Sequence, residues 1–189
     1  MFTPYTPFRN NDLISAEELE LAFVTLCKQG SDIKKISDAF KKLKACIDTY
    51  DPANKNNSLL KEVIGLGHSE VVEYLLTFQS VRNKLNEKII DLAFIHRLYP
   101  IVKRLEQLGY TLSTDLKNDA IKRLILSIRK PNKNNINSTD TIKSVLSINC
   151  IAGNINYVPE NWPENQNAIW WAWKTNNKPV MRLIVDHAL

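Results

Sequence analysis

The chain has 189 residues, of which 44% are hydrophobic and 24% are charged, a composition typical of a globular protein rather than of a disordered chain. Its formal net charge of +5 attracts acidic partners, but the basic residues are spread along the chain and form no arginine-rich block. The aromatic-interleaved pattern of RNA-binding segments is also missing, so nucleic acid is not the favoured partner.

Helical periodicity runs through almost every segment and strand alternation is nearly absent, which predicts an all-α fold. Ser15 and Glu18 form a capping box, which opens a helix that ends near Gly30. Ser31 can cap a second helix, in which apolar residues recur every three or four positions and lysines occupy most of the remaining surface. Residues 1–50 are therefore predicted to form an N-terminal helical pair.

A tight helical hairpin is predicted after the polar run Asn54 to Asn57. Ser58 can cap its first helix, Gly67 permits the turn, and residues 69–77 form its antiparallel partner. Three further hairpins have the same form. They are predicted at 87–109, where Pro100 starts a helix and Gly109 ends it, at 115–148 around a polar insertion at 129–135, and at 167–188 after a long loop at 153–166.

Each of these helix pairs is too small to bury its own apolar face. Five consecutive pairs with no strand between them are typical of a stacked array, in which neighbouring pairs bury one another. We therefore predict one continuous domain, a solenoid of about five stacked antiparallel helix pairs. In it, residues 1–50 form the N-terminal pair or cap and residues 51–189 form the repeats.

An internal repeat supports the array. When the sequence is aligned with itself so that Gly67 falls on Arg97, apolar positions of the 58–77 hairpin coincide with apolar positions of the next hairpin. When Gly67 falls on Asn176, they coincide with those of the last hairpin. The residues Leu60, Val71, Val72 and Leu75 fall on Ile90, Ile101, Val102 and Leu105 in the first alignment, and on Ile169, Val180, Met181 and Ile184 in the second.

The first of these segments resembles the ankyrin repeat. Gly67-His68, Glu70-Val71-Val72 and Leu75-Leu76 stand where that family has a Gly-His turn, a Glu-Val-Val triplet and a Leu-Leu pair. The resemblance is best over residues 58–83 and weaker at 87–109 and 167–186. It implies ankyrin-like helical repeats that bind a partner protein through a concave face.

The sequence departs from the family pattern at several positions. Lys61 replaces the usual histidine, Val63 and Ile64 replace two alanines, and Arg97-Leu98 and Asn176-Asn177 stand at the Gly-His turn. Larger residues at the alanine positions separate the helices, so irregular spacing is expected. Proteins of this family include effectors that intracellular bacteria deliver into host cells. The degenerate repeats and the Asn- and Lys-rich composition therefore favour, by resemblance, a bacterial effector that acts on a host protein.

Four tryptophans are concentrated near the C-terminus, with Trp162 in a loop and Trp170, Trp171 and Trp173 on one short helix. A helix cannot bury all three on one side, because successive residues point about 100° apart. They either cap the end of the array beneath the loop or expose an anchor for a partner, and the resemblance directs Trp171 to the groove. The resemblance frame predicts partner-binding residues at Glu62, Leu66, Leu92, His96, Trp171 and Lys174.

No catalytic, metal or cofactor motif accompanies these features. The histidines His68, His96 and His187 lack zinc-motif spacing, and His68 is explained as a turn residue of the repeat. Three cysteines without Cys-x-x-Cys spacing predict reduced, mostly buried thiols. Neither a Walker motif nor a G-x-S-x-G motif occurs, so we predict no enzyme activity, no cofactor and no metal.

The expected setting is cytoplasmic, or the host cytosol for a translocated effector, because no secretory signal and no membrane-length apolar run occurs. Two other functions stay open at this point. One is binding of nucleic acid or an acidic surface through helix 31–49 and loop 129–135. The other is an enzyme whose site combines distant residues and is not visible in the sequence.

Overall fold

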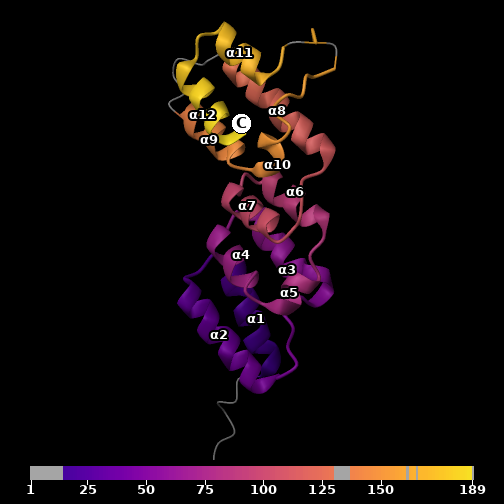
Figure 1. Ribbon diagram of the computed structural model, residues 1–189. Coiled ribbons are helices and arrows are strands. Elements are labelled where there is room, and N and C mark those ends of the chain that lie inside the picture. The colour runs from indigo at the N-terminus through magenta and orange to yellow at the C-terminus, as the bar shows by residue number, and fades with distance from the viewer. Residues whose placement is uncertain (1–14, 130–136, 161, 165, 189) are drawn as a thin grey trace, which may run out of the picture.

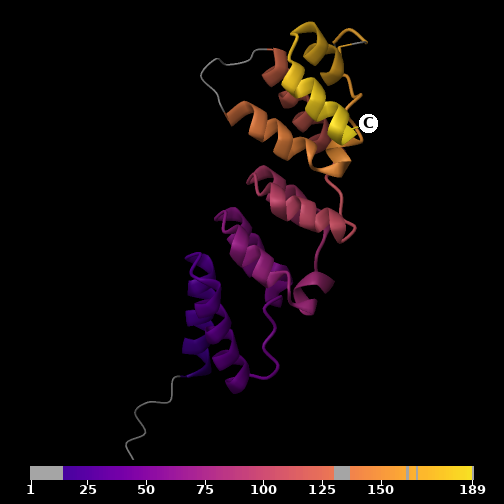
Figure 2. The same cartoon turned by 60° about the vertical axis from the view of Figure 1, so that its left-hand side comes forward.

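A computed structural model describes residues 15–129, 137–160, 162–164 and 166–188. Within these ranges the chain forms twelve helices and no strand, which confirms the all-α prediction. The helices are arranged as antiparallel pairs that follow one another in chain order along an elongated molecule (Figure 1, Figure 2).

The N-terminal part of the molecule contains three helix pairs. The pairs are α1 (Ala16–Lys28) with α2 (Ile33–Cys46), α3 (Asn54–Gly65) with α4 (Ser69–Leu75), and α6 (Glu87–Ile95) with α7 (Tyr99–Gln107).

The C-terminal part contains the remaining two pairs. They are α8 (Thr114–Arg129) with α9 (Asn137–Leu146), and α11 (Ala168–Lys174) with α12 (Lys178–Ala188). Two short helices that the sequence pattern did not predict lie between pairs, α5 (Gln79–Asn83) and α10 (Asn149–Ala152). The predicted insertion at 129–135 lies, apart from Arg129, outside the described residues.

The predicted starts of α1 and α7 are confirmed, whereas the cap of α2 is shifted by one residue. The capping box at α1 is confirmed, since Ser15 Oγ accepts from the Glu18 amide at 3.2 Å and Glu18 Oε2 accepts from the Ser15 amide at 2.8 Å. The predicted proline in the first turn of α7 is also confirmed. At α2, however, Asp32 rather than Ser31 is the cap, because its carboxylate accepts from the Lys34 amide at 2.8 Å.

The start of α3 differs from the prediction. The helix begins at Asn54, not at Ser58, and the polar run expected to be a loop forms its first turn. Asn57 is fully buried with a φ of +59°, a backbone conformation that asparagine tolerates better than most residues. Its Nδ2 donates to the carbonyl oxygen of Val81 on α5 at 3.0 Å, so the buried side chain is held by the neighbouring short helix.

Neighbouring pairs pack helix on corresponding helix. The first helices α1, α3 and α6 pack in succession, and so do the second helices α2, α4 and α7. In the C-terminal part α8 packs on α11 and α9 packs on α12, while α10 contacts α8, α9 and α12. Within the N-terminal part and within the C-terminal part, neighbouring pairs therefore cover one another's apolar sides, which removes from water a surface that no single hairpin could bury.

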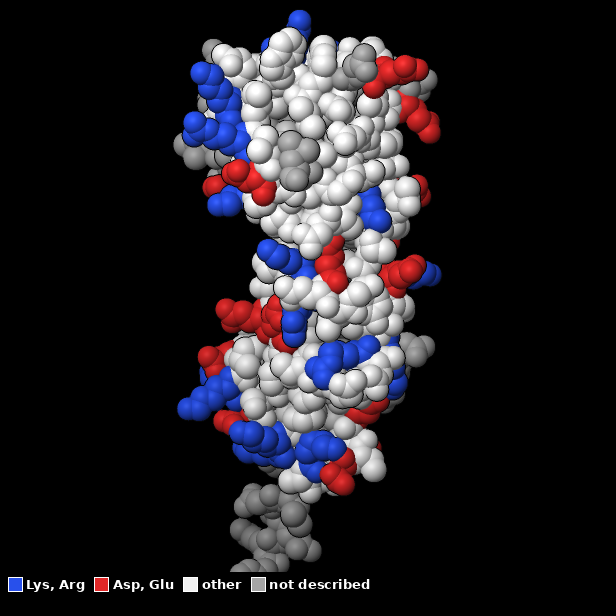
Figure 3. Space-filling model, in the orientation of Figure 1, with Lys and Arg blue, Asp and Glu red and all other residues white. Residues whose placement is uncertain are grey.

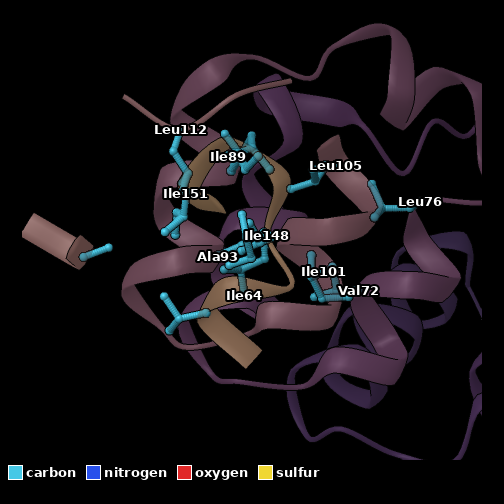
Figure 4. Packing of buried hydrophobic residues seen from close by; sticks show 14 of the residues in the cluster. Ile64, Val72, Leu76, Ile89, Ala93, Ile101, Leu105, Leu112, Ile148 and Ile151 are labelled. Carbon is cyan, nitrogen blue, oxygen red and sulfur yellow. The ribbon is translucent and has the colours of Figure 1, made fainter. Parts of the chain in front are cut away.

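The junction between α7 and α8 has few helix-to-helix contacts and depends on carboxylates. Glu106 of α7 accepts hydrogen bonds from the amides of Asn149 and Cys150 at 3.0 and 2.8 Å, at the start of α10. Asp91 of α6 accepts from the Ser113 amide at 2.9 Å, just before α8. Buried side chains continue across this junction in one cluster that includes Leu105, Leu112 and Ile151 (Figure 4).

The hairpin turns repeat the same backbone geometry. Gly30, Gly67, Arg97 and Asn176 end the first helices of their pairs with φ between +52° and +79°. In each turn the next amide donates to a carbonyl in the last turn of the helix, as in Leu98 to Ala93 at 2.9 Å. Since Arg97 and Asn176 are the residues that fall on Gly67 in the two alignments of the sequence with itself, those alignments correspond to equivalent turns.

This geometry gives a prediction for Arg97→Gly. A residue with a Cβ at φ +59° carries about 1–2 kcal/mol of strain, against about 0.5–1 kcal/mol of extra chain entropy lost by glycine. We expect the substitution to raise the free energy of unfolding by about 0.5–1 kcal/mol in urea denaturation. Lys103→Gly, in the exposed interior of α7, is the control and should lower it by about 1 kcal/mol. Equal losses at both positions would contradict the turn argument.

Candidate protein-interaction surface

Four of the six predicted binding residues lie on two helices that pack side by side. Glu62 is exposed on α3 and Leu66 follows that helix with half of its surface exposed. Leu92 on α6 is half-buried and packs against the core, whereas His96, which ends α6, is exposed. Glu62, Leu66 and His96 are therefore each exposed on, or at the end of, two first helices that pack together.

Ile95 belongs to the same region, although the sequence reasoning did not select it. Its side chain is 60% exposed at the end of α6, next to His96, and Leu66 is 50% exposed at the end of α3. Both residues therefore place a large apolar side chain in water at corresponding ends of packed helices. In the first alignment of the sequence with itself, Ile95 falls on Gly65, which is not one of the repeated apolar positions. That mismatch is the sequence signal that could have identified Ile95 as exposed.

Trp171 and Lys174 lie apart from the other four predicted residues. Both are on α11, which packs against α8 and α12 in the C-terminal part of the molecule (Figure 1). The indole of Trp171 is half-buried, and its Nε1 is buried without a hydrogen-bond partner among the described residues. The six predicted residues thus form two separate groups rather than one continuous surface.

The tryptophans form an aromatic cluster around Arg129. The guanidinium carbon of Arg129 lies 4.8 Å from the ring centre of Trp171 and 5.9 Å from that of Trp162, which comes from the 153–166 loop. Trp170 and Trp171 meet edge to face at 4.8 Å, and Lys174 lies 5.9 Å from the Trp170 ring. Trp173, by contrast, is 65% exposed, so it is the indole on α11 that faces solvent.

A groove of about 450 Å³ lies between α1, the segment before α3, and α3 itself. Its volume is within the range of ligand-binding clefts. Apolar side chains from both helices line it together with three carboxylates and one ammonium group. The lining residues are Glu17, Glu20, Leu21, Val24, Lys28, Tyr50, Pro52, Ser58, Leu59 and Glu62.

Only Glu62 of this groove was predicted from the sequence. Glu17 lies in the first turn of α1, where a carboxylate favours the helix dipole. Tyr50 lies in the segment between α2 and α3, and no local pattern marks it. The groove arises because α1 and α3, which are distant in sequence, pack side by side.

Charge and burial are both present in the groove. Glu62 forms an ion pair with Lys28 at 2.9 Å, and both side chains keep substantial exposure to water. Burial raises the pKa of the Tyr50 hydroxyl to about 12, and the carboxylate of Glu20 adds to the increase. Tyr50 is therefore a protonated hydrogen-bond donor throughout the neutral pH range.

Of the basic residues predicted for the alternative nucleic-acid surface, those that the structure describes lie in two separate places. Lys34, Lys35 and Lys42 are exposed on α2, while Lys41 pairs with Asp38 at 3.6 Å. Arg129 lies in the C-terminal part, over the tryptophan rings. On the face drawn in Figure 3, basic side chains form separate groups with acidic side chains between them.

His68 holds a turn, and the three cysteines differ in burial. His68 Nε2 lies 2.9 Å from the carbonyl oxygen of Lys28, so this side chain joins the α3–α4 turn to the end of α1. Of the thiols predicted to be mostly buried, Cys27 is buried, Cys150 is half-buried and Cys46 is exposed. No group of metal-ligating side chains occurs within the described ranges.

None of the described helices combines the length and the apolar character needed to cross a membrane. Comparisons with protein-family models, with curated proteins and with solved structures return no significant match to this chain.

Proposed function

We propose that this protein is an interaction scaffold that binds a partner protein through the exposed side of its first helices. In this proposal the helix pairs form an ankyrin-like solenoid, and the partner contacts Glu62, Leu66, Leu92, His96 and the neighbouring Ile95. The turn geometry shared by the successive hairpins supports an ankyrin-like array. The chemistry of the surface supports binding, since Leu66 and Ile95 each expose a large apolar side chain.

One observation carries the proposal, namely the paired exposure of Leu66 and Ile95. Single exposed leucines are common on protein surfaces and need no explanation. Two large apolar side chains that are 50% and 60% exposed at matching ends of packed helices are different, because a partner can cover both at once. Protein interfaces derive much of their affinity from such central apolar anchors surrounded by polar residues.

The effector setting, with the host cytosol as its location, is proposed on the composition and the degenerate repeats alone. In that setting the partner is a host protein.

In the same proposal, Trp171 and Lys174 belong to a second contact region on α11, where the exposed indole of Trp173 adds apolar area.

The proposal predicts that the double variant Leu66→Arg/Ile95→Arg loses a partner that the wild type captures. Two charged side chains placed within an apolar contact must be desolvated, so affinity for the purified partner should fall at least about tenfold. The partner is identified by affinity capture from cell extract with mass spectrometry, and its affinity is then measured by isothermal titration calorimetry.

The control is Leu126→Arg/Val185→Arg, which changes two similarly exposed apolar residues on α8 and α12. It should retain the partner. Capture of the same proteins with the same affinity by both double variants would contradict the proposed surface.

A further inference from the structure

The groove between α1 and α3 combines apolar walls with acidic side chains. Among the described side chains, its lining has three glutamates and one lysine, and Lys28 is already paired with Glu62 at 2.9 Å. Glu17 and Glu20 have no ion pair with any other residue in the described ranges. The described lining of the groove therefore has two carboxylates in excess, whereas the chain as a whole has a net charge of +5.

The walls of the groove suit a long side chain with a charged end. Leu21 and Val24 line it from α1, and Leu59 lines it from α3. Lysine and arginine cover apolar surface with their methylene stems while the charged group reaches a polar partner. Glu17 and Glu20 on α1 and Glu62 on α3 provide that partner on both sides of the groove.

The carboxylates are not arranged for a metal ion. A bound Ca²⁺ or Mg²⁺ needs several oxygen ligands within about 2.0–2.6 Å of one point. No cluster of acidic, histidine or cysteine side chains suited to a metal ion occurs among the residues described. The carboxylates are spread along a groove instead, which matches a cationic segment of polypeptide.

We propose that the groove between α1 and α3 binds a lysine- or arginine-containing segment of the partner protein, with its basic side chain between Glu17, Glu20 and Glu62. This inference rests on the proposed function and names the chemistry of the partner. Tyr50, as a protonated hydroxyl in the lining, donates a hydrogen bond to the segment without adding a negative charge.

The test uses a fluorescein-labelled peptide of eight arginines, acetylated and amidated at its ends, and the same peptide with citrulline in place of arginine. Citrulline has nearly the same shape as arginine but no charge. Fluorescence anisotropy should show binding of the arginine peptide to the full chain at low salt and at least tenfold weaker binding of the citrulline peptide. Equal affinity for the two peptides would overturn the proposal.

A matched pair of triple variants locates the binding. Glu17→Gln/Glu20→Gln/Glu62→Gln should weaken binding of the arginine peptide on the order of tenfold, since each carboxylate contributes a modest share. The control variant, Glu70→Gln/Glu73→Gln/Glu164→Gln, removes an equal number of negative charges from exposed positions outside the groove. It should change the affinity less than twofold, and an equal loss in both variants would show only general charge attraction and overturn the site.

Two other occupants of the groove have distinct results, and each would overturn the proposal. If a second copy covers the groove, light scattering shows an oligomer of the wild type that the groove variant dissociates. If the segment of the chain before Ser15 covers it, the arginine peptide binds only after Arg9→Gln. The surface at Leu66 and Ile95 is tested separately by the Leu66→Arg/Ile95→Arg variant. If that variant loses the partner but the groove variant retains it, the groove inference is wrong and the proposed function is not affected.

Discussion

Replacing Gly30 by alanine is expected to lower the free energy of unfolding by about 2–3 kcal/mol. Gly30 has a φ of +62°, where a residue with a Cβ carries about 1–2 kcal/mol of strain. A Cβ at this position would also lie 2.5 Å from Nδ1 of His68, so the imidazole must move. Its contact with the Lys28 carbonyl is then lost, at a further cost of about 1 kcal/mol.

Two other glycines separate these contributions when all three variants are compared by urea denaturation. Gly67→Ala has the same kind of backbone strain, with a φ of +79°, but its Cβ meets nothing within 4 Å, so a loss of about 1–2 kcal/mol is expected. Gly65→Ala, in the last turn of α3, meets nothing either and should stabilise the protein by up to about 1 kcal/mol. Equal losses at Gly30 and Gly67 would show that His68 does not restrict the turn.

Trp171→Ala should also destabilise the protein, by about 2–3 kcal/mol, whereas Trp173→Ala should change stability by less than about 0.5 kcal/mol. Trp171 packs against the core and against the guanidinium of Arg129 at 4.8 Å, so its removal leaves a gap and an unstacked cation. Trp173 is 65% exposed and has few contacts to lose. Thermal and urea unfolding followed by circular dichroism distinguish the two variants.

Of the two roles that the sequence leaves open for the tryptophans, this expectation favours packing beneath the loop over the groove position that the ankyrin resemblance implies for Trp171. The repeat frame places a residue on one side of a helix but says nothing of a loop that covers it. Here the 153–166 loop brings Trp162 to Trp171, with ring centres 6.4 Å apart. If Trp171→Ala melts like the wild type and loses the partner, the anchor hypothesis is supported over the packing role.

The helical fold could be predicted because its determinants are local. Ser15, Gly30 and Gly109 mark helix ends through their own side chains or the lack of one, and the apolar residues recur with helical spacing. The start of α3 could not be predicted in this way. Asn57 is accommodated by a hydrogen bond to Val81 on a different helix, and no local pattern reveals that contact.

The candidate site shows the same division. Glu62, Leu66 and His96 could be named as candidates because they occupy repeated positions on the first helices. Tyr50 and Glu20 were missed, since their role depends on α1 lying against α3. Ile95 was missed for a different reason, because an exposed isoleucine and a buried one look alike in a single sequence.

The two amides held by Glu106 have a consequence for how the molecule comes apart. The helices from α8 onward touch the preceding ones mainly through side chains, so one carboxylate supplies much of the directional bonding at this boundary. Removal of the Glu106 carboxylate would weaken the coupling between the N-terminal and C-terminal parts. The calorimetric melting curve would then broaden or split, while each part kept its own cooperative transition. The protein would then unfold as two cooperative segments rather than as a single unit.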